Sequence, residues 1–230
     1  MIILKFPVQK AHSLARKPAE QTVNRDAILL AAAGVLQRHG YAATTMKDIA
    51  AQLSLTAGTL YHYFANKDTL VLAVLEMGLE AGIARIEPLA CADTAPSVKL
   101  RSMIAAHITG LTEQPAIGAA MVFELKALAQ VAPPAADARP KDHHDFAAFS
   151  EHRRHFFKRR DDFENLFLKV VKAGITQGDF RAIDASIYVK TLLGAQNWVG
   201  VWYRAEGRLN GATIAERMAD HLMYGVMSLS

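Results

Sequence analysis

The chain has 230 residues, of which 51% are hydrophobic, with 26 Lys and Arg residues against 22 Asp and Glu. This composition is typical of a globular protein and excludes a disordered chain. The single cysteine, Cys91, excludes a disulfide framework and a cysteine-based zinc site. The longest apolar run, 27–36, falls short of the ~18–20 residues of a membrane helix. Because the opening 1–4 is too short for the core of a signal peptide, we expect a cytoplasmic protein.

The excess of positive charge lies at the N-terminal end. Residues 1–70 hold eight Lys and Arg residues and four Asp and Glu, so they account for the whole formal net charge of +4. A basic end on a neutral body is typical of a module that faces a polyanion.

Helical patterns begin after residue 24. Residues 1–24 lack periodicity and are predicted to form a flexible N-terminal arm. Apolar stripes, capping residues and helix breakers then predict four helices, which run from about Arg25 to Gly40, from Thr45, from Thr56, and from Asn66 to Pro88.

The rest of the chain is also patterned as helices separated by prolines and glycines. Stripes predict helices over about 100–111, 117–128, 145–177, 184–204 and 210–227, with Gly178 as a C-terminal glycine. No strand alternation is visible. We therefore predict an all-α fold of about nine helices. A three-helix helix-turn-helix domain over 25–70 would precede a larger ligand-binding and dimerisation domain over 71–230.

The two short helices carry residues that suit DNA. Joined by the tight turn 53–56, they match a helix-turn-helix, whose second helix enters the major groove. That helix offers hydroxyls, an imidazole and two very small residues: Thr56, Ala57, Gly58, Thr59, Tyr61 and His62. Hydroxyls and aromatic rings can contact phosphates or thymine methyls, and small residues allow close approach. Lys67 opens the next helix, where its charge and the helix amides could hold a phosphate together.

Residues 25–75 resemble the DNA-binding domain of the TetR family of bacterial transcriptional repressors. The match runs in register through 28–50, 57–64 and 66–70. The resemblance implies that Thr45 and Lys47 contact the backbone or an adjacent base. It implies that 56–59 line the groove, and that Tyr61, His62 and Lys67 hold phosphates. It also implies core positions for Leu53, Leu60, Tyr63 and Phe64.

The same resemblance implies that the C-terminal domain binds an inducer and dimerises through its last two helices, 184–204 and 210–227. Both helices read as apolar over more than one face. Residues 160–203 are similar to TetR-type regulators of fatty-acid, sterol and aromatic-acid catabolism, some of which respond to acyl-CoA thioesters. Inward stripes nominate the following ligand contacts, for which plain core packing is the alternative: Met103, His107, Met121, Phe123, Phe163, Phe167, Asn197 and Trp198.

A basic and histidine-rich segment over 139–160 holds seven Lys and Arg residues, three acids and four histidines. It would suit an anionic ligand with an apolar tail beside a cavity, or it is a solvated helix face. His144, His152 and His155 are too far apart on one helix for all three to bind one metal ion, so only His152 with a neighbour such as His155 could share one. We predict neither a metal site nor a cofactor.

These patterns predict a ligand-responsive repressor that binds a pseudo-palindromic operator as a homodimer. Its small-molecule inducer would be an acyl-CoA or another apolar carboxylate derivative. The alternative is a constitutive DNA-binding regulator without an inducer, which a filled C-terminal core would favour. An enzyme is not expected, because no nucleophile–base pair, paired carboxylates or phosphate-binding glycine loop is present.

Overall fold

The computed structural model describes residues 24–227, and the regular secondary structure in this range is helical apart from one isolated bridge between Phe180 and Met227. The helices are α1 (Arg25–Ala43), α2 (Met46–Gln52), α3 (Ala57–Tyr61), α4 (Lys67–Cys91), α5 (Pro96–Glu113), α6 (Pro115–Ala129), α7 (Pro140–Gln177), α8 (Ala185–Asn197), α9 (Val199–Trp202) and α10 (Gly211–Tyr224). Only Trp198 separates α8 from the four-residue α9. The all-α fold of about nine helices is therefore confirmed. Among these helices, none has the length and apolarity that would let it cross a membrane.

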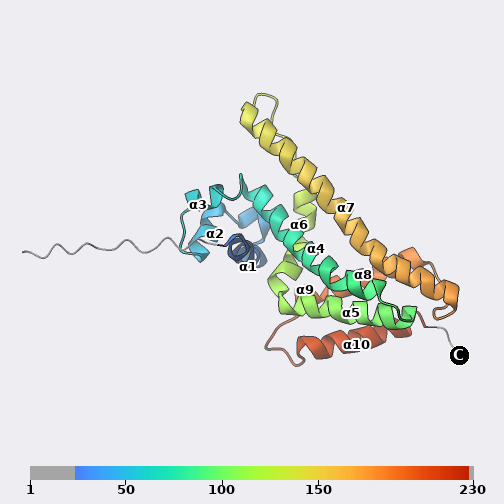
Figure 1. The fold of residues 1–230 in the computed structure, drawn as a ribbon. Helices are drawn as coiled ribbons and strands as arrows, with labels where there is room; N and C mark the ends of the chain where they lie inside the picture. The colour runs from blue at the N-terminus through green and yellow to red at the C-terminus, as the bar shows by residue number, and fades with distance from the viewer. Residues whose placement is uncertain (1–23, 228–230) are drawn as a thin grey trace, which may run out of the picture.

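The helices form two regions joined by one long helix. Helices α1, α2 and α3 lie together at one end, and α4 leads from them into the larger helical region (Figure 1). The 38-residue α7 runs along α4 and projects beyond it at its N-terminal end (Figure 1). The predicted arm over 1–24 lies outside the described residues except for Asn24, which caps α1. The predicted boundary at residue 70 falls within α4, so the two regions share a helix.

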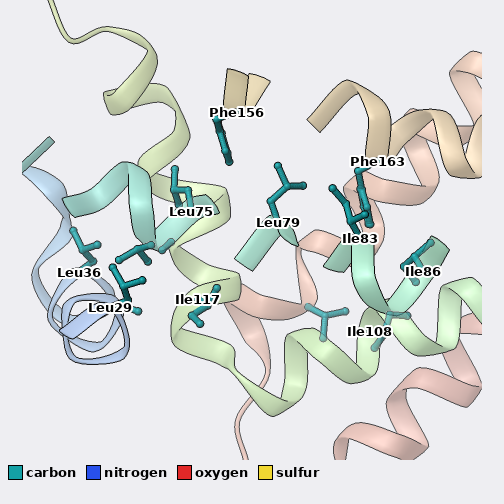
Figure 2. Packing of buried hydrophobic residues seen from close by; sticks show 14 of the residues in the cluster. Leu29, Leu36, Leu75, Leu79, Ile83, Ile86, Ile108, Ile117, Phe156 and Phe163 are labelled. Carbon is teal, nitrogen blue, oxygen red and sulfur yellow. The ribbon is translucent and has the colours of Figure 1, made fainter. Parts of the chain in front are cut away.

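Buried side chains of α4 connect the cores of the two regions. Near its start, Leu75 lies close to Leu29 and Leu36 of α1 (Figure 2). Further along, α4 contributes buried residues that face α5, α6 and α7, and Figure 2 shows them with their neighbours: Leu79, Ile83, Ile86, Ile108, Ile117, Phe156 and Phe163. Burying one such side chain stabilises the fold by about 1.5–3 kcal/mol. A displacement of α4 would therefore disturb packing at both ends.

Capping side chains fix the predicted helix starts. Thr45, Thr56, Asn66 and Asp184 each accept hydrogen bonds from backbone N–H groups in the first turn of α2, α3, α4 and α8. Gly178 ends α7 in the left-handed conformation, with φ of 84°. These local predictions are confirmed, because capping depends on neighbouring residues alone.

Three helix ends differ from prediction. Helix α1 leaves helical geometry at Gly40, where φ is 70°, but a further turn continues to Ala43. Helix α4 passes Pro88 and ends three residues later, so the proline lies in the last turn and does not itself end the helix. Helix α7 begins at Pro140 rather than near Asp145, since proline suits the first turn of a helix.

Helix α10 also corrects a prediction. It is apolar on one face only, and this face packs against α5. Its outer face carries the exposed charged or polar residues Glu216, Arg217, Asp220 and His221. Arg101 of α5 bridges to two of these, at 2.6 Å from Glu216 and 2.9 Å from Asp220. The expectation of a second apolar face holds for α8–α9, described below, and is wrong for α10.

Candidate functional site

Helices α2 and α3 present most of the predicted DNA contacts to solvent. The exposed members are Thr45, Lys47, Thr56, Gly58, Tyr61 and His62, whereas Ala57 and Thr59 are half-buried. A fully buried Leu60 anchors α3 to the core, so the opposite side of this short helix faces outward. The two helices thus expose these side chains at the end of the molecule that α1–α3 occupy (Figure 1).

The threonine hydroxyls on this surface already have structural partners. Thr45 Oγ1 donates to Asp48 Oδ2 at 2.7 Å and accepts from Asp48 N at 3.2 Å. Thr56 Oγ1 accepts from Thr59 N at 3.3 Å and lies 3.1 Å from Thr59 Oγ1. These bonds hold the starts of α2 and α3, and they orient the residues that follow.

No neighbour among residues 24–227 requires glycine at position 58. A Cβ added there would lie 3.6 Å from Thr56 Oγ1, which is an ordinary contact, and the residue is exposed. Glycine in a helix is less favourable than alanine by up to ~1 kcal/mol. Packing within the described residues therefore does not explain the glycine at this position.

Two predicted positions near α4 differ in their surroundings from the sequence expectation. Lys67 is half-buried, and its Nζ donates to the backbone oxygen of Tyr41 at 2.8 Å and lies 4.2 Å from the centre of the Tyr41 ring. Its contact with a phosphate stays a prediction. Tyr63 was expected in the core but is 40% exposed, because α3 ends before it and the chain turns outward.

A buried carboxylate joins α6 to the N-terminal region. Glu124 is only 4% exposed, and its Oε2 accepts from the backbone N–H of Tyr41 at 3.1 Å. Tyr41 also donates its phenol proton to Asp68. Burial raises the pKa of the Glu124 carboxyl, and the bond from Tyr41 and the charge of Lys67 oppose this shift. The sequence analysis did not predict this contact. The only indication in the sequence was Glu124 itself, an acid within the largely apolar segment 115–129.

A cavity of about 410 Å³ lies in the C-terminal region, lined by α4, α5, α6, α7 and α8. This volume is within the range of small-molecule sites in proteins. Four predicted ligand contacts line it: His107, Met121, Phe163 and Asn197. The wall also carries glycines and charged residues that the sequence prediction did not single out, among them Gly78, Gly82, Gly194, Arg85 and Lys190.

The other four predicted contacts lie elsewhere. Met103 and Phe167 are fully buried in the core. Phe123 and Trp198 are 55% and 53% exposed, and their rings meet edge to face at 6.4 Å on the outer surface. The prediction that these two side chains face inward is wrong. Phe123 follows the cavity residue Met121 by two positions and lies on the other side of α6, and Trp198 follows the cavity residue Asn197 at the end of α8.

The cavity is mostly apolar but has distinct polar positions. His107 Nε2 donates to Asn197 Oδ1 at 3.1 Å within the wall. Two ion pairs belong to the lining, Arg85–Glu113 at 2.6 Å and Lys190–Glu164 at 2.7 Å. Arg160 also lines the cavity, and among residues 24–227 it has neither an ion-pair nor a hydrogen-bond partner. Arg160 therefore offers a cation that the protein itself does not neutralise.

Most of the basic segment 139–160 is occupied by structural contacts. Arg139 and Arg154 pair with acids one turn away on α7, and Arg159 makes two bonds to Glu80 of α4, at 2.9 and 2.7 Å. Arg153 binds backbone oxygens at the end of α6. Only Arg160 of the seven basic residues lines the cavity. Within the described part of the chain, no group of three or more His, Cys, Asp or Glu side chains is arranged to hold a metal ion.

Two short helices joined by a tight turn, with a buried anchor and an exposed second helix, define a helix-turn-helix DNA-binding protein. The model for the tetR family of bacterial regulatory proteins matches residues 28–74, and the model for a tetracyclin repressor-like C-terminal domain matches residues 143–226. The chain belongs to the TetR family of transcriptional regulators.

Similar proteins extend the match over nearly the whole chain. The HTH-type transcriptional repressor KstR2 of Mycolicibacterium smegmatis is 24% identical over 211 residues, which are 91% of this chain and 93% of that protein. The solved structure of the ketosteroid transcriptional regulator KstR2 of Mycobacterium tuberculosis has a TM-score of 0.75 at 21% identity, over 91% of this chain and 98% of that one. AibR in complex with isovaleryl coenzyme A and operator DNA has a TM-score of 0.69 at 23% identity, over 86% and 97%.

Proposed function

We propose that this protein is a ligand-responsive repressor, which binds a pseudo-palindromic operator as a homodimer and is released when an anionic ligand with an apolar body enters the C-terminal cavity. The observation that carries this proposal is Arg160, an unneutralised cation in the wall of a largely apolar cavity. A filled C-terminal core would favour the alternative, which is a constitutive regulator without an inducer. The 410 Å³ cavity therefore supports the ligand-responsive alternative.

The DNA contacts we propose are those of α2, α3 and the start of α4: Thr45, Lys47, Thr56, Ala57, Gly58, Thr59, Tyr61, His62 and Lys67. The exposure of most of these residues on one surface supports this assignment. Recognition helices of a dimer would reach two half-sites about one DNA turn, ~34 Å, apart. For Lys67, binding a phosphate would require its Nζ to leave the backbone oxygen of Tyr41.

The ligand class follows from the charges of the cavity wall. An anionic group, either a carboxylate or a phosphate of a coenzyme A thioester, would pair with Arg160. The apolar body would lie against Met121 and Phe163. Arg85 and Lys190 already have acidic partners, so they contribute less to anion binding. The structure of AibR with isovaleryl coenzyme A, at a similar fold, supports a thioester as one form of such a ligand.

Helix α6 is the route by which we propose that the ligand acts on the DNA-binding helices. Ile117, Gly118 and Met121 of α6 line the cavity, and Glu124, one turn further, holds the backbone of Tyr41 at the end of α1. A ligand that pushes on α6 would therefore move or strain this contact. Because binding linkage is reciprocal, the same coupling would make operator DNA weaken ligand binding.

The dimer would form through the outer face of α8–α9. Its exposed positions recur at helical spacing and are apolar or hydroxyl-bearing: Ile187, Thr191, Trp198 and Trp202. Phe123 of α6 extends this surface beside Trp198. Exposed apolar patches of this kind mark protein interfaces. Helix α10, whose outer face is polar, would lie at the edge of the interface and not at its centre.

The oligomeric state can be tested by sedimentation with a matched control. Trp198→Arg should convert a dimer to a monomer, because it places a charge in an apolar interface. Val98→Arg should leave the dimer intact, since Val98 has the same exposed fraction of 53% but lies on α5. Equal behaviour of the two variants would contradict the assigned interface.

The ligand response can be tested on operator DNA selected by the protein from a random pool. Decanoate and decanoyl-CoA serve as probes that separate a carboxylate from a thioester. At least one should release the operator, and Arg160→Gln should require at least tenfold more of it, by loss of a charge-assisted hydrogen bond. Release that is unchanged in Arg160→Gln would contradict the proposed anion site.

A further inference from the structure

The polar pair His107–Asn197 stands out in the cavity wall. Neither side chain takes part in an ion pair within the described residues, and the His107 ring has apolar aromatic neighbours. The His107 ring lies 5.2 Å from the ring of Phe163 and 6.4 Å from that of Phe167. A polar group in such surroundings costs free energy unless it is hydrogen-bonded. A leucine or phenylalanine at each position would fill the same wall without that cost.

The bond within the pair uses only part of its hydrogen-bonding capacity. His107 Nε2 donates to Asn197 Oδ1, which leaves the two N–H groups on Asn197 Nδ2 and the lone pair on His107 Nδ1. Among residues 24–227, neither Nδ2 nor Nδ1 has a hydrogen-bond partner, and both residues line the cavity. The pair therefore has an unused donor on Asn197 and an unused acceptor on the edge of the His107 ring that points away from Asn197.

The imidazole holds no charge to offer. Burial lowers the pKa of His107, and the bond to Asn197 only partly opposes this, so the ring is neutral near pH 7. A neutral pair of this kind can recognise an uncharged oxygen atom of a ligand by hydrogen bonding, but it does not attract a second anionic group. Arg160, on α7, supplies the positive charge of the site from another helix.

We infer that His107 and Asn197 are specificity-determining residues that select a ligand with a keto or hydroxyl oxygen on its apolar body, in addition to its anionic group. A ketone oxygen would accept from Asn197 Nδ2. A hydroxyl would accept from Nδ2 in the same way, or donate to His107 Nδ1 at the other edge of the ring. This inference rests on the proposed function, since it assumes that the cavity binds the ligand.

A panel of ten-carbon acids tests the pair in the full-length protein. The probes are decanoate and its positional isomers with one keto group along the chain, and binding is measured by calorimetry. Because the carboxylate is the same in every member, differences in affinity report the contribution of the keto oxygen. The wild type should bind one or two adjacent isomers about tenfold more tightly than decanoate, the size expected of a hydrogen bond in a buried site.

Variants separate the pair from the rest of the cavity. His107→Phe and Asn197→Leu should each abolish the positional preference while retaining decanoate binding. Leu193→Met, a volume-conserving change in the same wall, should keep the preference. Arg160→Gln should weaken all members by the same factor. Thermal unfolding of each variant checks that the fold is intact. If either His107→Phe or Asn197→Leu fails to fold, the other still tests the pair.

The outcomes distinguish this inference from the proposed function. Equal binding of decanoate and every keto isomer by the wild type would overturn the inference and leave an anion-binding cavity. A preference that survives in both His107→Phe and Asn197→Leu would also overturn it. Binding of no acid at all would overturn the proposed carboxylate ligand and, with it, this inference.

Discussion

Replacing Gly58 by alanine should move stability and DNA affinity in opposite directions. The added Cβ meets only Thr56 Oγ1, at 3.6 Å, so it causes no clash within the chain. The helix gains up to ~1 kcal/mol, and less than this in the first turn of a five-residue helix. If α3 approaches the bases closely at this point, the methyl group displaces the helix from the groove. We then expect a loss of at least ~1.4 kcal/mol, about tenfold in affinity, similar to the loss of a base contact.

Thermal unfolding and fluorescence anisotropy with a selected operator measure the two effects of Gly58→Ala. A suitable control is Gly34→Ala in α1, where the added Cβ also has its nearest contact at 3.6 Å, with Arg38. The control should raise stability and leave DNA affinity unchanged. If Gly58→Ala is stabilised and binds DNA as tightly as the wild type, the close approach of α3 at this residue is refuted.

Two further predictions concern buried polar contacts. Because burial raises the pKa of Glu124 above 4.5, ionisation costs folded-state stability as the pH rises through that raised pKa. Glu124→Gln, which keeps an acceptor for Tyr41, should match the wild type at pH 4 and gain relative to it towards pH 7 in urea unfolding. A pH-independent difference would contradict this. Arg153→Ala should cost about 1–3 kcal/mol in the same assay, since Arg153 binds the backbone oxygens that end α6. Arg154→Ala, which removes only an exposed pair, should cost under ~0.5 kcal/mol, and equal costs would argue against the capping role.

Local features of the fold could be predicted from sequence because their causes are local. A capping threonine such as Thr45 bonds to a residue three positions away, and Gly178 adopts a backbone conformation that it favours by itself. The helix-turn-helix followed from these signals together with a buried Leu60. Pro88 misled because the effect of a proline depends on its distance from the end of the helix.

Residues that line the cavity were harder to distinguish in the sequence from residues of the proposed dimer surface, because an apolar stripe does not show which part of the molecule packs against it. Met121 and Phe123 are neighbours on α6, yet one lines the cavity and the other lies on the outer surface. The direction of each depends on how α6 rotates against α4 and α9. At the α6–α9 crossing, a Cβ at Gly200 would come within 2.9 Å of the Gly118 backbone. Such a close approach is a property of two distant segments, and no pattern within one helix predicts it.

The roles of the charged residues in 139–160 also depend on contacts between distant segments. Their number suggested an anion site, but most of them bind α4, the end of α6 or their own helix. Arg160 differs because it lies in the cavity wall and makes no ion pair or hydrogen bond within the described residues. What distinguishes a ligand-binding arginine from a structural one is thus its partners in space, which sequence spacing on α7 does not reveal.

The most direct test of the account is the affinity of the dimer for its selected operator, measured by anisotropy with and without a ligand shown by calorimetry to bind the cavity. Decanoate and decanoyl-CoA are the first ligands to use, with Arg160→Gln as the variant that identifies cavity binding. We predict that a cavity-bound ligand weakens operator binding at least tenfold. An unchanged operator affinity with the cavity saturated would contradict the proposed ligand-responsive repressor.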